Sequence, residues 1–314
     1  MITPLPTLKK TTRLLYLKIA NCLPEFRENK ILILGDGRSG TTWIQQVLNH
    51  DGRFIEFFEP FHKNKIHSEN FYPVSDSLYS KESYILDIVN GLGVQKRVSE
   101  KPKIPLYRGI LIKDVSCFFW LEKLNNLCPS LKFIGVVRNP ISVALSKMKY
   151  GHWCKAEEFK GFPVNDEQRS QIDNDLWDII TKSAKSEFLW HILNWSHLNS
   201  ILIGHAKQFG FPIVFYENLK ADPEKHFETI FNYLNLNDFQ SDCTSNLMAA
   251  LSRSSKTTNH RAQTHSNNEA DLNLSQTELD AVRKILSIYE LGNIYDSNWL
   301  PRTIDLDQCV PLSH

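Results

Sequence analysis

The residues best suited to chemistry lie in a glycine-rich stretch that runs from Ile31 to Trp43 and reads ILILGDGRSGTTW. It opens as a short apolar run and closes in a helical pattern, which predicts a strand, a turn and a helix start. Gly35 and Gly40 have the spacing of a P-loop, whose glycines let successive backbone N–H groups point at one anion. The helix N-terminus adds partial positive charge. The stretch therefore predicts a phosphate-binding loop in preference to a plain tight turn.

The side chains of this loop differ from those of a nucleoside triphosphatase. Thr41 takes the position of the usual P-loop lysine, and Thr42 takes that of the Ser/Thr. Arg38 supplies a cation elsewhere in the loop, and Ser39 adds a further hydroxyl donor. The group that reaches the β- and γ-phosphates of ATP is thus missing, which argues against a kinase. A P-loop kinase with Asp114 as its magnesium ligand is nevertheless the alternative enzyme.

A second candidate anion site follows the apolar run Phe133–Val137. Arg138 ends this predicted strand, and Pro140 suits the first turn of the helix that follows. Ser146 lies roughly two turns into that helix. Arginine offers paired donors, so Arg138 and Ser146 could face a single phosphate. The alternative is an arginine at a strand edge and an ordinary helical serine.

Together the two motifs resemble those of the sulfotransferases that use 3′-phosphoadenosine 5′-phosphosulfate (PAPS). The segment Arg38–Trp43 is similar to their 5′-phosphosulfate loop, in which carbohydrate-modifying members often have Arg-Ser-Gly and cytosolic members Lys-Ser-Gly. Arg138 and Ser146 match the family's 3′-phosphate motif. The resemblance extends over residues 30–295.

Weaker matches elsewhere in the chain agree with this resemblance. Lys113 ends a strand at the place where the family has a basic residue, and Tyr216–Pro223 resembles its Tyr-Glu-x-Leu-x-x-x-Pro element. Arg253 and Lys256 lie where the family places a basic loop over the nucleotide. The resemblance implies that PAPS is the co-substrate, that adenosine 3′,5′-bisphosphate is the product and that no metal takes part. It implies these cofactor-binding residues: Arg38, Ser39, Gly40, Thr41, Thr42, Trp43, Arg138, Ser146, Arg253 and Lys256.

Sulfuryl transfer needs neutralisation of the leaving oxygen and a base for the acceptor hydroxyl. Arg38 is suited to the first task, and Lys113 can assist it. Cytosolic members place a histidine two positions after that lysine, but this chain has Val115 there. Glu59 precedes a proline, which predicts an extended backbone at a strand end. Sugar-modifying members of the family have a similar Glu-Pro element near their acceptor site, and this resemblance makes Glu59 the candidate base.

An equal alternative for Glu59 is that it only orients Arg38 or Lys113 through an ion pair. His62 and Asp114 are the other candidate bases. Arg38, Glu59 and Lys113 thus form the predicted catalytic set.

Short apolar runs alternate with helical patterns along the chain. The runs Ile31–Leu34, Gly109–Ile112, Phe133–Val137 and Ile213–Phe215 are typical of buried strands. Helices are predicted at Thr42–Leu48, Phe118–Asn126, Ile141–Lys149, Leu176–Lys207 and Ser275–Ile288, the last with a capping box at Ser275 and Glu278. This alternation predicts an α/β fold, a P-loop-type parallel sheet with helices on both faces, in a single domain.

Three segments are expected along the chain. Residues 1–29 form an N-terminal amphipathic segment, which could lie on a membrane or a partner, or pack on the domain itself. Residues 30–298 form the sulfotransferase-like P-loop domain, and residues 299–314 form a C-terminal tail. Two polar stretches, Gly151–Asn174 and Ser252–Asn273, are predicted to be long loops, the first near the acceptor.

Composition excludes several function classes. The net charge of +1 over 314 residues argues against nucleic-acid binding. The six cysteines are scattered without a CxxC pair, and no histidine cluster suggests a metal site. No apolar run reaches the roughly 20 residues of a membrane span. Free thiols and a cytoplasmic location are therefore expected.

The sequence thus predicts a sulfotransferase that moves a sulfuryl group from PAPS to an acceptor hydroxyl. The acceptor could be a carbohydrate, a lipid, a peptide tyrosine or a small alcohol. The alternatives are a P-loop small-molecule kinase and a non-catalytic nucleotide-binding protein.

Overall fold

A five-stranded parallel sheet forms the centre of the protein, and its strands are ordered β2-β3-β1-β4-β5. The computed structural model describes residues 19, 22, 28–61, 82–91, 108–150, 169–170, 172–182, 186–236 and 274–302. The strands are β1 (Lys30–Gly35), β2 (Phe54–Phe58), β3 (Gly109–Asp114), β4 (Leu131–Val137) and β5 (Ile213–Phe215). The predicted parallel α/β sheet is confirmed.

Several predicted features lie outside the described residues. They are His62, Arg253, Lys256, the stretch Ser252–Asn273, most of Gly151–Asn174, most of residues 1–29 and residues 303–314.

Strand β2 was not among the predicted strands. Among the described strands, it occupies the edge of the sheet and pairs only with β3. Its sequence, FIEFF, places a glutamate among aromatic residues and runs directly into Glu59-Pro60, so it lacks the continuous aliphatic pattern of the central strands. An edge position tolerates this composition because an edge strand forms its backbone hydrogen bonds with a neighbouring strand on one side.

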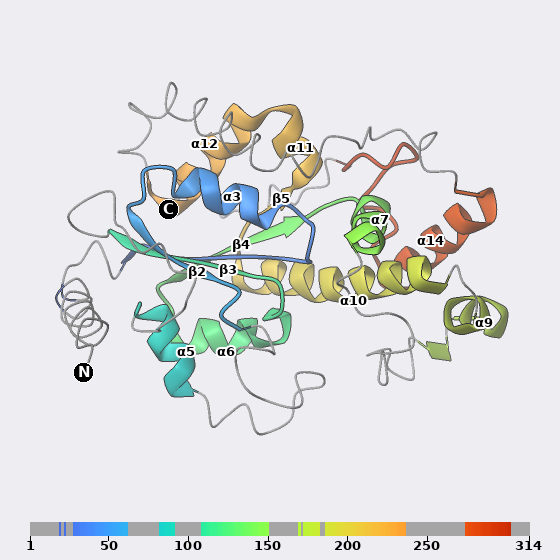
Figure 1. Ribbon diagram of the computed structural model, residues 1–314, viewed down its shortest axis with the longest axis horizontal. Coiled ribbons are helices and arrows are strands. Elements are labelled where there is room, and N and C mark those ends of the chain that lie inside the picture. The colour runs from blue at the N-terminus through green and yellow to red at the C-terminus, as the bar shows by residue number, and fades with distance from the viewer. Residues whose placement is uncertain are drawn as a thin grey trace, which may run out of the picture.

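Alternate residues of β1 face two separate cores, as the two-residue period of a strand requires. Ile31 and Ile33 pack with α3 (Thr41–Leu48), α11 (Tyr216–Ala221) and α12 (Pro223–Leu234). Leu32 and Leu34 belong to the opposite core, with α5 (Glu82–Val89), α6 (Leu121–Leu127) and α10 (Ser186–Phe209). Figure 1 shows these two helical layers on either side of the sheet. Helices on both faces are therefore confirmed.

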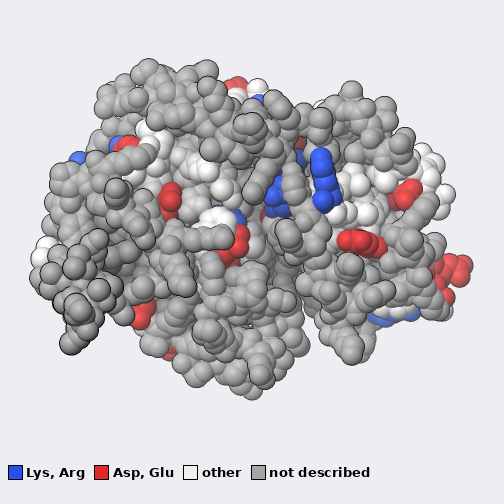
Figure 2. Space-filling view, in the orientation of Figure 1, with Lys and Arg blue, Asp and Glu red and all other residues white. Residues whose placement is uncertain are grey.

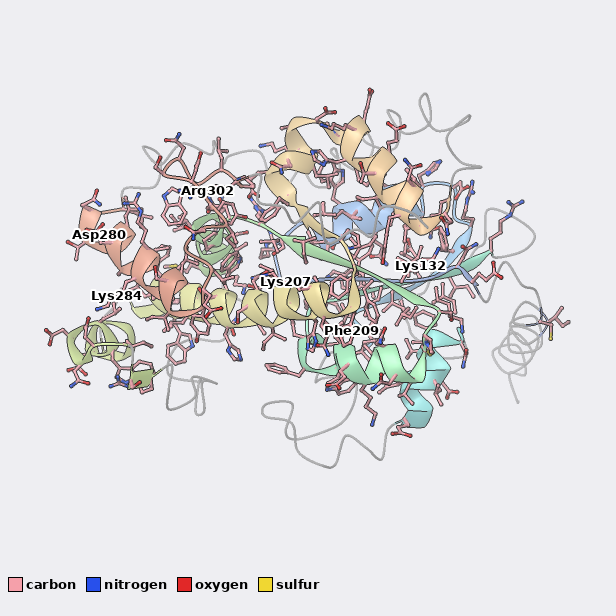
Figure 3. The ribbon with its side chains drawn as sticks, turned by 180° about the vertical axis from the view of Figure 1, so that it is seen from behind. Lys132, Lys207, Phe209, Asp280, Lys284 and Arg302 are labelled. Atoms are coloured by element: carbon pink, nitrogen blue, oxygen red, sulfur yellow. The ribbon has the colours of Figure 1, made fainter. Side chains whose placement is uncertain are left out.

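The long helix predicted at Leu176–Lys207 is two helices in the structure. These are α9 (Asn174–Lys182) and α10, and residues 183–185 between them lie outside the described part. Neither glycine nor proline separates the two helices, so no local stop signal marks the end of α9. Figure 3 shows α10 crossing the sheet when the molecule is seen from behind, with Phe209 at its end. In α10, Phe188, Ile192 and Trp195 are buried, as their spacing predicts.

Local capping signals set the other helix boundaries. The predicted helix Phe118–Asn126 begins as a 3-10 turn, η2 (Phe118–Trp120), and continues as α6. Helix α7 (Pro140–Tyr150) starts at its proline, and α12 follows Asp222, whose side chain accepts from the Lys225 amide. Helix α14 (Gln276–Ile288) has the predicted capping box of Ser275 and Glu278.

Candidate active site

The candidate residues gather where the strands of the sheet end. From β1 the chain passes to β2 and β3 on one side of the sheet and then to β4 and β5 on the other. The strand order therefore reverses at β1, and ligands of open α/β sheets bind in the crevice beyond the carboxyl ends of the strands at such a point. The loop that contains Arg38 follows β1, and Arg138 follows the adjacent strand β4.

Gly40 closes the loop after β1 and precedes the first residue of α3. Its φ of 93° lies in the left-handed region, which favours glycine. A Cβ atom at this position would lie 2.4 Å from Cδ2 of Tyr216. The backbone of the loop thus comes into direct contact with an aromatic ring, and a side chain has no room there.

The loop presents hydrogen-bond donors that no group in the described part of the chain accepts from. Within the described residues, the backbone N–H groups of Gly40, Thr41 and Thr42 have no protein acceptor. The hydroxyl of Ser39 is fully buried and also lacks a partner in this part of the chain. A buried donor without an acceptor, such as the Ser39 hydroxyl, is costly, so it indicates a ligand that completes it. At a helix N-terminus that ligand is an anion.

Direct hydrogen bonds join the two predicted phosphate motifs. Arg38 Nε donates to Ser146 Oγ at 2.9 Å, and Arg138 Nη1 donates to the carbonyl oxygen of Arg38 at 3.0 Å. The Arg138 guanidinium also lies over the Tyr216 ring, 4.5 Å from its centroid. Segments about a hundred residues apart in sequence thus form one cationic site.

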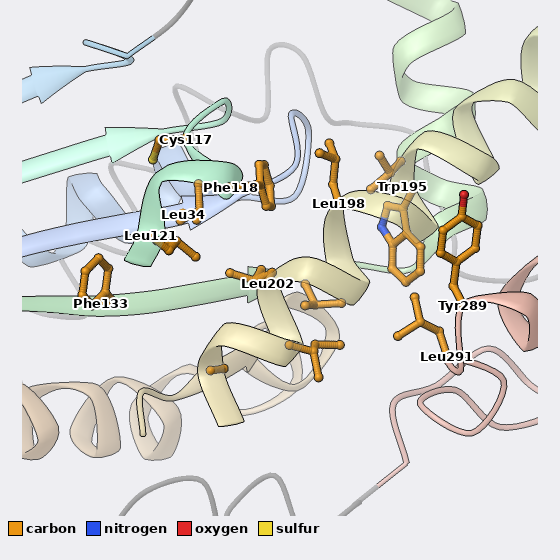
Figure 4. Close-up of a cluster of buried hydrophobic side chains, with 14 of the residues drawn as sticks. Leu34, Cys117, Phe118, Leu121, Phe133, Trp195, Leu198, Leu202, Tyr289 and Leu291 are labelled. Atoms are coloured by element: carbon orange, nitrogen blue, oxygen red, sulfur yellow. The ribbon is translucent and has the colours of Figure 1, made fainter. Parts of the chain in front are cut away.

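Buried side chains from α10, α11 and the segment after α14 hold the turn at Arg138. The indole Nε1 of Trp195 donates to the Arg138 carbonyl oxygen at 2.9 Å, and Figure 4 shows Trp195 within the hydrophobic cluster on α10. Glu217 accepts from the Asn139 amide at 2.8 Å and from the Tyr295 hydroxyl at 3.3 Å. Burial raises the pKa of Glu217, and the Asn139 amide opposes this shift. Sequence reasoning did not assign Trp195 or Tyr295 to the site, because nothing local marks these contacts.

Glu59 and Lys113 form an ion pair at the ends of β2 and β3. Lys113 Nζ donates to Glu59 Oε1 and lies 4.4 Å from the centroid of the Phe58 ring. The side chain of Lys113 is 4% exposed and that of Glu59 is 23% exposed, so the carboxylate is the accessible partner.

The extended backbone predicted for Glu59 is wrong. Its φ is 50°, in the left-handed region, and its N–H donates to the Lys113 carbonyl oxygen at 2.6 Å. This bond turns the chain back over the end of β3 and overrides the preference of a residue before proline.

Asp114 anchors the loops on either side of this pair. One carboxylate oxygen accepts from the Phe61 amide at 2.8 Å, and the other accepts from the amides of Ser116 at 2.7 Å and Cys117 at 3.1 Å. Complete burial raises the pKa of Asp114 to about 6, although the amides of Phe61 and Ser116 oppose the shift. The structure thus gives Asp114 the role of a loop anchor.

Comparison with known families agrees with this arrangement. A family model described as "Sulfotransferase domain" matches residues 28–279. The chain belongs to the sulfotransferase domain family. A search among curated proteins finds no match to the chain.

The protein is therefore a sulfotransferase, of a family whose members depend on PAPS.

Its Trp43 contacts Tyr216 and Phe227 edge to face, with ring centroids 5.9 Å apart in both pairs. Within the described part of the chain, no group of three or more His, Cys, Asp or Glu side chains is arranged to hold a metal ion. In the same part, Cys22, Cys117 and Cys128 are free thiols.

The surface of the sulfotransferase shows mixed charge. Figure 2 shows basic and acidic side chains interspersed on one face, among the residues described there. None of the described helices has both the length and the apolar character that crossing a bilayer requires.

Proposed function

We propose that this sulfotransferase takes PAPS as its donor, with the 5′-phosphosulfate on residues 38–43 and the 3′-phosphate at Arg138 and Ser146. The observation that carries the proposal is the pair of hydrogen bonds that join Arg38 to Ser146 and Arg138 to Arg38. They support two anion subsites side by side, as a nucleotide with two separated phosphates requires. When bound, this nucleotide supplies the sulfuryl group.

Different residues of the chain neutralise charge and accept the proton during sulfuryl transfer. Arg38 neutralises charge on the leaving oxygen, and the buried Lys113 faces the transferred group from the end of β3. Glu59, the accessible member of the ion pair, takes the proton of the acceptor hydroxyl or else keeps Lys113 oriented. The ion pair itself is compatible with both roles for Glu59.

The remaining assignments rest on the sequence. Trp43, Arg253 and Lys256 complete the nucleotide site, and the acceptor is a carbohydrate, a lipid or a small alcohol. The division into residues 1–29, 30–298 and 299–314, the peripheral membrane contact of the first segment and a cytoplasmic location stay predictions.

Calorimetry with adenosine 3′,5′-bisphosphate, AMP and ATP tests the donor. The bisphosphate should bind without metal and at least about tenfold more tightly than AMP, because a charge-assisted bond contributes about 1.5–3 kcal/mol. Ser146→Ala should reduce this preference. Ser142→Ala, on the same helix, is the matched control and should keep it.

Equal affinity for the bisphosphate and AMP would remove the basis for the 3′-subsite. Tight binding of ATP only in the presence of magnesium would favour the kinase alternative.

A further inference from the structure

A buried ion pair joins the two phosphate motifs at a second point. Lys147 Nζ donates to both carboxylate oxygens of Asp36, at 2.7 and 2.6 Å. The side chains are only 2% and 3% exposed. Asp36 directly follows β1 and opens the phosphate loop, whereas Lys147 directly follows Ser146 in α7.

Stability alone is a poor explanation for this pair. Removing two charges from water costs several kcal/mol for each ion, and apolar residues of similar volume often serve the fold as well or better. What an ion pair adds is a defined geometry, because an ammonium that donates to both oxygens of one carboxylate holds its Nζ at a fixed place relative to that carboxylate. This contact lies next to both anion subsites. It therefore fixes the position of one subsite relative to the other.

We propose that Asp36 and Lys147 are a positioning pair that sets the spacing between the 5′- and 3′-phosphate subsites. The inference rests on the proposed nucleotide function. It adds a third contact to the two through Arg38, so that the loop after β1 and helix α7 move as one unit. Asp36 and Lys147 need not touch the nucleotide, because they act through Arg38 and Ser146.

The consequence is a coupling between the two phosphates of one ligand. A ligand with two anchored groups gains the full benefit of both only when the subsites are already at the matching distance. If the spacing drifts, each phosphate can still bind by itself, but the second adds less to the affinity. The pair should therefore affect adenosine 3′,5′-bisphosphate much more than a monophosphate.

Calorimetry on charge variants tests this coupling with three probes: adenosine 3′,5′-bisphosphate, AMP and adenosine 3′-monophosphate. Lys147→Met should raise the Kd of the bisphosphate by at least about tenfold, while the Kd of each monophosphate changes by less than about threefold. The double variant Asp36→Asn/Lys147→Met leaves no unpaired charge buried, so it tests the same point if the single variant fails to fold. The control is Lys149→Met, at an exposed position of α7, which should change none of the three.

A purely structural role predicts a different pattern, in which thermal stability falls and all three affinities change in proportion. That pattern, or a double variant with the wild-type preference for the bisphosphate, would overturn the positioning role. The proposed function fails separately, if the wild-type protein itself shows no preference for the bisphosphate over AMP.

Discussion

Replacing Gly40 by alanine tests the geometry of the phosphate loop most directly. At a φ of 93° a residue with a side chain is strained, at a cost of about 1–3 kcal/mol. The new Cβ would also lie 2.4 Å from Cδ2 of Tyr216, so the ring or the loop must move. Tyr216 carries the Arg138 guanidinium on its ring, so a shift of the ring disturbs the 3′-subsite as well.

Two measurements follow from this reasoning. The free energy of unfolding in urea should fall by about 2 kcal/mol, the middle of the range for backbone strain. The affinity for adenosine 3′,5′-bisphosphate should fall by at least about tenfold, since both subsites are displaced.

Gly204→Ala is the matched control for the Gly40 variant. Gly204 lies in α10 at an exposed position, and a Cβ there meets nothing within 4 Å. Alanine in a helix interior should raise the free energy of unfolding by about 0.5–1 kcal/mol and leave nucleotide binding unchanged. A Gly40→Ala protein with wild-type stability and wild-type affinity would refute the assigned loop geometry.

Three further predictions concern the base, the pH dependence and a helix cap. Glu59→Gln should lower turnover by about 100-fold with little change in nucleotide affinity if Glu59 is the base, whereas both should change if it only orients Lys113. Burial, and then the charge of Lys147, lower the pKa of His191 to about 3. Below pH 6.5 the unfolded chain is therefore protonated at His191 while the folded chain is not, and the folded state loses stability as the pH falls. His191→Gln should therefore lose about 2 kcal/mol less stability than wild type between pH 7.5 and 5, and the same change at the partly exposed His226 should not reproduce this difference. Ser275→Ala removes the capping box of α14 and should cost about 1 kcal/mol in urea unfolding, while Thr277→Ala in the same turn should cost less.

The features that the sequence predicted correctly are those with a local cause. The turn from β1 into α3 follows from Gly35 and Gly40, and the start of α14 follows from Ser275 and Glu278. Each of these signals lies within a few residues of the structure that it determines. The central strands were predicted for the same reason, because burial on both faces leaves a continuous apolar run.

Features that depend on distant contacts could not be predicted in this way. Asp36 and Lys147 are 111 residues apart, and no local sequence pattern at either residue predicts the ion pair. The backbone of Glu59 was predicted from the proline that follows it, but a hydrogen bond to Lys113 decides its conformation. The spacing of Trp195 within its helix predicts only that it is buried, and the fold shows that its indole also supports Arg138.

The order of the strands suggests how the site divides between donor and acceptor. The nucleotide motifs follow β1 and β4, which are neighbours, with Gly35 opposite Val136. Of the candidate catalytic pair, Glu59 follows β2 and Lys113 lies near the end of β3, with Phe58 opposite Lys113. Adjacent strands are about 4.8 Å apart, so the two pairs of loops lie next to each other along one edge of the sheet.

Arg38 follows β1, the strand between these two halves. A transfer that runs in line from donor to acceptor therefore places the acceptor hydroxyl on the side of β2 and β3, across from Arg138. Substitutions in the loops after β2 and β3, Glu59 apart, should then change acceptor preference while donor affinity stays constant. Substitutions after β4 should do the reverse, because the proposed 3′-phosphate subsite lies on that side of Arg38.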